Sequence, residues 1–322
     1  MNCHPENDGQ GLTYPATAER PEHVEFAAGA VRYEDPFVWL EEGSDPDVLA
    51  WQSAQDELAH AYLTRLPQYQ GFVDKLEKMG SSEDSLLPMF AGGYYVHRFV
   101  PEGQDLAVVE LSETPTGPRR RVVDLNAMRT DEPLQIAAYA LSLSGKLAVF
   151  AYTAGGHEKP IVQLMDVETG RVLSQGLPSQ RLSTFTWLPD DSGFFYMSMD
   201  SADIAAGKTL YRVLLDRPTE ATLEAVEPSH FYVRPVVADD QRHILLFANH
   251  LAPRPEYILD TQGDGSWQPF LKNTSGIFRG DIVGERFFAI TDDAAARGRM
   301  VAIPLGTPER RDTWQEIIAP SD

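Results

Sequence analysis

Apolar side chains follow a helical spacing in the first quarter of the chain. Asp45 can accept a hydrogen bond at a helix start, and Pro46 suits the first helical position. The apolar residues that follow are three, seven, four and four positions apart: Val48, Trp51, Leu58, Tyr62 and Leu66. The pattern predicts a helix that begins at about residue 46 and is stopped by Pro67.

A second, shorter helix is predicted directly after this proline. One side of it is apolar and carries Tyr69, Phe72, Val73, Leu76 and Met79. Gly80 is its expected C-terminal stop, because glycine is common just after the last helical residue.

From about residue 86 the pattern changes to short β-rich segments separated by polar turns. The clearest β-rich segments are residues 94–100, 106–111, 147–152, 194–199, 244–247 and 287–291. The turn clusters are residues 101–103, 144–145, 189–193, 239–241 and 283–285.

The turn clusters recur at a nearly constant interval. Gly145 to Gly193 is 48 residues, Gly193 to Gln241 is 48, and Gln241 to Glu285 is 44. Each unit reads as a strand, a tight polar turn, an apolar strand, a longer loop, a third strand and a weaker fourth. Four short strands per unit of this length are typical of a β-propeller blade, and a β-sandwich with irregular loops is the alternative.

The repeat predicts a mainly β fold with about five four-stranded propeller blades. The expected blades are residues 86–130, 134–178, 180–227, 229–274 and 276–319. The predicted organisation is a loose lead-in over residues 1–30, a helical segment over 31–85 and a partial propeller over 86–322. In an incomplete ring the first and last blades each leave one face bare, and the candidates for these faces are Tyr95, Val108, Phe288 and Ile303.

Composition narrows the possible partners and compartment. The 322 residues are 43% hydrophobic, which is enough for a sizeable core, and their net charge of −21 argues against nucleic acid or an anionic membrane as a partner. Cys3 is the only cysteine, so no intrachain disulfide can form, which fits a reducing compartment and an expected cytoplasmic location. The first ten residues lack the features of a signal peptide, and no apolar run is long enough for a membrane span.

Two motifs in the helical segment resemble a known family. Residues 35–42 read D-P-F-V-W-L-E-E, and residues 51–56 read W-Q-S-A-Q-D. They are similar to the N-terminal signature of the prolyl oligopeptidase family of serine peptidases, D-P-Y-x-W-L-E-D followed by W-x-x-A-Q-N. Phe37, Glu42 and Asp56 are mild departures from it. The predicted blade turns at residues 141–148 and 186–196 also resemble those of the family.

The resemblance implies more than the residues alone establish. Members of this family pair an α/β-hydrolase domain with a seven-bladed propeller, which covers the active site and admits short peptides. The helical segment would belong to the hydrolase side, and the chain would hold roughly five of the seven blades. The complete enzyme would cleave short peptides on the carboxyl side of proline, so the implied partners are a short peptide and the remaining part of the enzyme.

The chain itself offers no catalytic residue. It contains neither the G-x-S-x-G elbow of a serine hydrolase nor an S-x-x-K motif, and Cys3 lies in the lead-in. We therefore expect this chain alone to be inactive. The alternative is a free-standing propeller that binds a peptide or protein; the WD40 variety is disfavoured because no Trp-Asp dipeptide occurs.

No metal or cofactor site is predicted. His157, His230, His243 and His250 lack the spacing of a zinc site, and residues 260–265 read as a hairpin turn rather than a calcium loop. The basic run at residues 119–121 reads as a solvated hairpin rather than an anion site. For Trp39 and Trp51, the sequence leaves open whether they anchor an interface or pack in a core.

Overall fold

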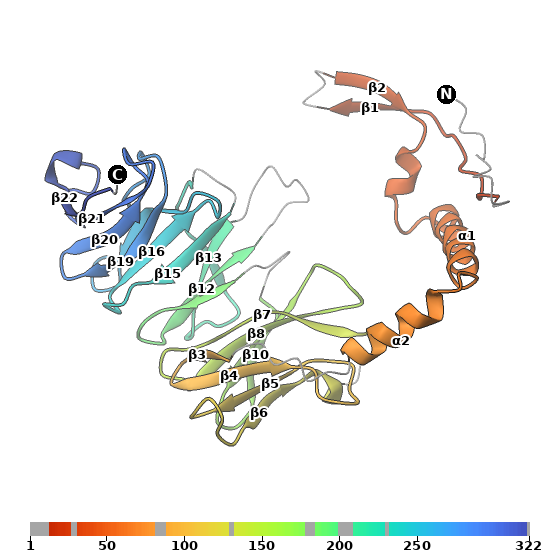
Figure 1. Ribbon diagram of the computed structural model, residues 1–322, viewed down its shortest axis with the longest axis horizontal. Helices are drawn as coiled ribbons and strands as arrows, with labels where there is room; N and C mark the ends of the chain where they lie inside the picture. Colours follow the sequence, from red (N-terminus) through yellow and green to blue (C-terminus); the bar gives the residue numbers. More distant parts are fainter. Residues whose placement is uncertain are drawn as a thin grey trace. The chain divides into compact units, whose positions relative to one another are not determined.

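The chain forms two compact units, residues 1–80 and 81–322. The computed structural model describes residues 13–26, 31–80, 88–128, 132–177, 184–198, 209–228 and 232–320. Cys3 and His230, two residues considered above, lie outside these ranges. Figure 1 shows the helices in the first unit and the sheets of the second.

The first unit consists of a hairpin followed by helices. Its elements are β1 (Glu22–Phe26), β2 (Val31–Asp35), the 3₁₀ helix η1 (Val38–Glu41), α1 (Pro46–Leu63) and α2 (Tyr69–Gly80). The hairpin departs from the loose lead-in expected over residues 1–30. Its strands were missed because both are short and rich in charged side chains, which hides the alternation of apolar and polar residues that each contains.

The start of α1 is as predicted, and its end is earlier. The Asp45 carboxylate accepts a hydrogen bond from the backbone N–H of Asp47 at 2.7 Å, and Pro46 is the first helical residue. The helix ends at Leu63 instead of running to Pro67, because the following N–H groups of Arg65 and Leu66 bond only three residues back. The α-helical bonding has therefore tightened into a turn before the proline is reached.

The two tryptophans hold the lead-in against the helical elements of this unit. Trp39 is buried, its Nε1 donates to the Ala18 carbonyl at 2.9 Å, and the Arg20 guanidinium lies 4.3 Å from its ring centroid. Trp51 Nε1 donates to Thr17 Oγ1 at 2.9 Å. Both side chains thus have packing roles inside the first unit.

Replacing Trp39 with alanine is expected to lower the free energy of unfolding of this unit by about 3–5 kcal/mol, the usual cost of removing a buried aromatic side chain. The measurement is urea denaturation followed by helical circular dichroism, since α1 and α2 lie in this unit. Leu49→Ala is the matched control, because Leu49 is an exposed residue of α1. An unchanged midpoint for Trp39→Ala would mean that the indole contributes nothing to packing.

The second unit contains five four-stranded antiparallel sheets in its described residues. The first is β3 (Met89–Ala91), β4 (Tyr94–Phe99), β5 (Val108–Ser112) and β6 (Arg120–Asp124), and the second is β7 (Leu134–Leu141), β8 (Leu147–Ala154), β9 (Ile161–Asp166) and β10 (Val172–Gln175). The third is β11 (Phe185–Trp187), β12 (Gly193–Ser198), β13 (Thr209–Leu214) and β14 (Ala221–Leu223). The fourth is β15 (Val233–Val237), β16 (His243–Ala248), β17 (Arg254–Asp260) and β18 (Trp267–Pro269). The fifth is β19 (Phe278–Val283), β20 (Arg286–Thr291), β21 (Arg299–Pro304) and β22 (Gln315–Ile318).

Within each sheet the strands pair in chain order, as in a propeller blade. The mainly β propeller fold predicted from the repeat is therefore confirmed. In the described part of this unit, the short 3₁₀ helices η2 (Leu125–Ala127) and η4 (Arg311–Thr313) accompany the strands. No helix in the described ranges combines the length and the apolar character that a membrane span requires.

Two of the four equivalent turn residues, Gly145 and Gln241, are those that the spacing used, whereas Asp191 and Gly284 take the places of Gly193 and Glu285. Gly145, Asp191, Gln241 and Gly284 share a positive φ of 53–71° between the first two strands of their sheets. Gly193 instead begins β12, where an added Cβ would lie 2.1 Å from the Val213 carbonyl oxygen. Glycine is thus needed at 193 for close strand approach, whereas the turn conformation falls on Asp191.

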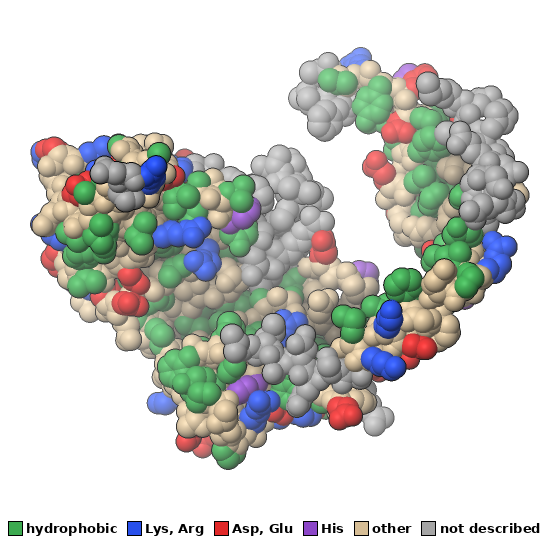
Figure 2. All heavy atoms as spheres, in the orientation of Figure 1, with side chains coloured by type: hydrophobic (Ala, Val, Ile, Leu, Met, Phe, Trp, Pro, Cys, Tyr) green, Lys and Arg blue, Asp and Glu red, His purple; other side chains and the backbone are tan. Residues whose placement is uncertain are grey.

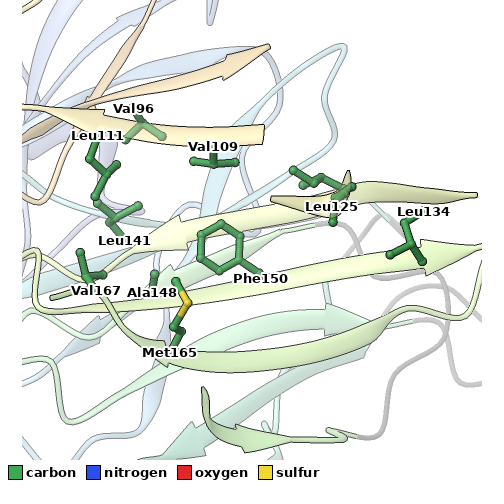
Figure 3. Packing of buried hydrophobic residues seen from close by; sticks show 11 residues of the cluster. Val96, Val109, Leu111, Leu125, Leu134, Leu141, Ala148, Phe150, Met165 and Val167 are labelled. Atoms are coloured by element: carbon green, nitrogen blue, oxygen red, sulfur yellow. The ribbon is translucent and has the colours of Figure 1, made fainter. Parts of the chain in front are cut away.

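Each sheet packs against the next through alternating side chains. Val109 and Phe150 lie in the cluster shared by the first two sheets, where Figure 3 shows the side chains pointing toward one another. Phe194 and its neighbour Phe195 lie in different clusters, toward the second and fourth sheets respectively. A final cluster, which includes Phe287 and Ile303, joins the fourth and fifth sheets. Strands buried on both faces explain the continuous apolar runs in the sequence.

Two of the four side chains predicted to lie on bare faces are fully buried. Ile303 pairs with Phe287 and faces the fourth sheet, and Val108 has no exposed surface. Tyr95 and Phe288 are half-buried. Strand register places only Ile303 on an inner face. Tyr95 and Val108 lie on the outer face of the first sheet, and Phe288 lies with Ile290 on the outer face of the fifth.

Candidate functional site

A cavity of about 490 Å³ lies between the fourth and fifth sheets. It is lined by Tyr232, Arg234, Val236, Phe247, Asn249, His250, Pro253, Arg279 and Gly280. Most of these residues belong to β15, β16 and β19 or to the loop after β16. First strands of neighbouring sheets come together elsewhere in this unit too, where β11 contacts both β7 and β15.

Strand alternation places the side chains of β15 at the cavity. Val233 and Pro235 are buried, while Arg234 between them is exposed. Arg234 is paired with Phe247 of β16, so both lie on one face of the sheet. On β19 the same pattern occurs, with exposed Arg279 following buried Phe278.

The loop after β16 forms a fixed wall of the cavity. The backbone N–H of Asn249, which has a positive φ of 62°, donates to the Tyr232 carbonyl at 2.9 Å. Asn249 Oδ1 accepts the N–H groups of Leu251 and Ala252 at 3.0 and 3.2 Å. The Pro253 carbonyl then accepts the Phe278 N–H at 2.8 Å, which joins this loop to β19.

The cavity is positively charged in a strongly acidic chain. Its lining contains two arginines and no aspartate or glutamate. Arg234 and Arg279 contact no carboxylate among the described residues. By contrast, three arginines of the same two sheets each contact one: Arg242 with Asp260 at 2.6 Å, Arg254 with Glu256 at 2.8 Å and Arg299 with Asp293 at 3.5 Å.

The two histidines seven residues apart have separate environments. His243 Nδ1 lies 2.6 Å from Asp240 Oδ2 in the turn before β16, and hydrogen bonds from His243 help to lower the pKa of Asp240. His250 lines the cavity, and its ring packs edge-on against Tyr232 with 4.9 Å between ring centroids. No group of three or more potential metal-ligating side chains occurs in the described ranges.

The loop at residues 260–265 is a hairpin turn between β17 and β18, as predicted. Asp260 accepts two hydrogen bonds from Arg242, which lower the pKa of its carboxyl group to about 2. Asp264 accepts hydrogen bonds from Ser266. Both carboxylates are thus engaged in local structure.

The basic run at residues 119–121 has partners for each of its side chains. The Arg119 guanidinium lies 5.5 Å from the Phe99 ring centroid, and Arg120 donates to the Val167 carbonyl at 2.7 Å. Arg121 contacts Glu110 and Asp124 at 3.1 and 2.7 Å. These contacts support the hairpin interpretation over an anion site.

One serine–histidine pair occurs in the first sheet, with His97 Nε2 2.8 Å from Ser112 Oγ. Both side chains are buried, so a substrate could not reach them. Ser112 Oγ donates to the Thr114 carbonyl at 2.7 Å, and burial lowers the pKa of His97. The pair is therefore part of the sheet's packing and lacks the exposed nucleophile of a hydrolase.

Comparison with known proteins identifies the family. Residues 15–322 match the family described as prolyl oligopeptidase, N-terminal β-propeller domain, and the chain belongs to it. A prolyl endopeptidase from Elizabethkingia meningoseptica is 24% identical over 320 residues, which cover 96% of this chain and 45% of that relative. The chain thus spans about half the length of the curated relatives it matches.

Solved structures share the fold at low sequence identity. A prolyl endopeptidase structure from a study of inter-domain dynamics matches with a TM-score of 0.76 and 19% identity, over 96% of this chain and 47% of that one. Prolyl oligopeptidase B from Galerina marginata, bound to a 35-residue hydrolysis and macrocyclization substrate, matches with a TM-score of 0.69 and 17% identity. That match covers 96% of this chain and 48% of the fungal one.

Proposed function

We propose that this chain is the N-terminal segment and propeller part of a prolyl oligopeptidase-type serine endopeptidase. Its role is to control the access of short proline-containing peptides to a catalytic domain that contributes the Ser-Asp-His residues. The observation that carries the proposal is the match of residues 15–322 to the N-terminal β-propeller domain of the family. The chain aligns with only 45% of the prolyl endopeptidase from E. meningoseptica. The partners are the peptide substrate and the rest of the enzyme.

The surface of the first unit supports a partner for its helices. Phe72, Leu76 and Met79 recur at helical spacing along α2 and are each 64–71% exposed. Figure 2 shows apolar side chains at the surface along this part of the chain. Apolar faces of this kind mark interaction sites, and we assign the helical segment of residues 31–85 to the hydrolase side of the enzyme.

The division into a lead-in, a helical segment and blades over residues 86–322 is part of the same proposal. So is a cytoplasmic location, which is supported by the single cysteine at position 3.

The isolated chain is expected to have no peptidase activity, because it contains no G-x-S-x-G elbow. The assay uses a proline-containing chromogenic peptide together with a serine-directed covalent probe. The control is a complete prolyl endopeptidase under the same conditions. Turnover that the probe abolishes, with the label attached to this chain, would contradict the proposal.

A further inference from the structure

We propose that Arg234 and Arg279 form a carboxylate-binding site, through which the propeller favours peptides that carry a negative charge. The inference rests on the proposed function, since it assumes that peptides reach the propeller. It adds a substrate preference to that function: the bound group is the C-terminal carboxylate of a peptide or the side chain of an acidic residue within it.

The charges of these two arginines are not compensated by any described carboxylate. Acidic residues outnumber basic ones by 48 to 27, yet neither guanidinium contacts a carboxylate among the described residues. Two like charges on the walls of one cavity repel each other, and an anion between them removes this repulsion. The site is thus complementary to an anion that none of the described residues supplies.

The hydrogen-bond donors at the cavity suit a carboxylate. A guanidinium presents its N–H groups in a planar fork that matches a carboxylate, often through two parallel hydrogen bonds. Asn249 adds a donor, because its Oδ1 is occupied by the loop backbone while its Nδ2 bonds to none of the described residues. Val236, Phe247 and Pro253 supply the apolar part of the lining, which suits the aliphatic portion of a peptide.

The overall charge of the chain favours a peptide carboxylate over a polyanion as the ligand. The net charge of −21 repels nucleic acid and other extended polyanions at long range. A single carboxylate on a short peptide meets much less of this repulsion. The cavity volume of about 490 Å³ lies within the range of about 300–1,000 Å³ that is usual for small-ligand sites.

The test measures peptide affinity with the full chain labelled at its single cysteine, Cys3, so that thermophoresis can be run at nanomolar protein concentration. Four forms of one N-acetylated hexapeptide, Gly-Ala-Pro-Ala-Glu-Ala, are compared: with Glu or with Gln, each with a free or an amidated C-terminus. Glutarate serves as a probe that carries carboxylates without a peptide. The four forms distinguish an acidic side chain from a C-terminal carboxylate as the bound group.

We expect at least one charged form to bind about tenfold or more tightly than the neutral Gln amide, because two guanidinium groups can donate charge-assisted hydrogen bonds to its carboxylate. Added salt should reduce this preference. Arg234→Met and Arg279→Met should each weaken binding of the charged form about tenfold and leave the neutral form unchanged. Arg217→Met is the matched control, because Arg217 is an exposed arginine outside the cavity. Both cavity arginines are exposed, so the urea midpoints of the variants should match that of the parent chain.

The outcomes separate the two proposals. The carboxylate site is overturned if charged and neutral peptides bind with equal affinity, or if both cavity variants keep the charge preference of the parent chain. Either result leaves the proposed access of peptides to the propeller unaffected. If glutarate binds in a way that depends on both arginines and no peptide binds, the carboxylate site is supported and the proposed function is contradicted. If neither glutarate nor any charged peptide binds, the carboxylate site is overturned.

Discussion

The purified 322-residue chain is expected to self-associate at micromolar concentration and to bind a hydrophobic dye. The reason is an exposed apolar face of the fifth sheet. This face points away from the hydrophobic cluster that joins the fifth sheet to the fourth. Ile290 pairs with Met300, and Met300 pairs with Ile318, so the three side chains cross β20, β21 and β22 on one face. Ile290 and Ile318 are 63% and 60% exposed. If ~400 Å² of such surface is covered on association, the gain is on the order of 10 kcal/mol, comparable to the stability of a whole domain.

The first sheet is expected to contribute less to this association. Phe90 is 66% exposed and contacts Tyr95, with 5.1 Å between ring centroids. The same face also carries the His97–Ser112 pair and Glu110, which contacts Arg121. This mixture of polar and apolar groups makes the face of the fifth sheet the stronger driver.

Sedimentation velocity and dye fluorescence measure the effect. Replacing both Ile290 and Ile318 with lysine should shift the chain toward a monomer and reduce dye binding. Leu251→Lys should change neither, because Leu251 is equally exposed but lies in the loop after β16. A monodisperse, cooperative and dye-free parent chain would favour a closed five-bladed ring, and the free-standing binding propeller would become the better interpretation.

The fold was predictable because its signals are local. The helix start depends on residues close in sequence, namely the capping Asp45 and the proline at the first helical position. The short apolar strands between polar turns are local signals of the same kind. Features that depend on pairing were not predictable. The buried face of Ile303 follows from its register against Phe287. The turn conformation falls on Asp191, with a φ of 59°, because strand pairing places Gly193 against Val213.

The cavity was not predictable for a similar reason. Arg234 and Arg279 are 45 positions apart, and each follows a buried residue at the start of a strand, which is an ordinary place for a solvent-facing arginine. Only the packing of two neighbouring sheets brings both to one cavity. His250 was considered in the sequence only as a possible metal ligand, whereas the structure places it beside Tyr232 in the cavity wall. The single usable signal was alternation on β15 and β19, and it does not reveal which arginines lack an acidic partner.

Glu256→Ala is expected to destabilise the second unit by about 3–5 kcal/mol, the usual cost of removing one partner of a buried ion pair. Glu256 lies in β17 between two buried residues and is itself 0% exposed. Its Oε1 accepts a hydrogen bond from Arg254 Nη2 at 2.8 Å. Arg254 is mostly buried as well, and its Nε has no hydrogen-bond partner among the described residues. Without the Glu256 carboxylate, a positive charge stays in a low-dielectric interior with less compensation.

Matched variants separate this charge effect from a loss of packing. Glu256→Gln keeps the volume and one acceptor oxygen but loses the charge, so an intermediate loss of stability is expected. Replacing both Arg254 and Glu256 with methionine should recover much of the loss, because both charges of the ion pair are then removed together. Asp312→Ala is the surface control: its ion pair with Arg310 at 2.8 Å is exposed and should contribute no more than about 1 kcal/mol. The free energy of unfolding is measured in urea by circular dichroism in the β-sheet region. A Glu256→Ala variant as stable as Asp312→Ala would show that the buried pair adds nothing to the stability of the fourth sheet.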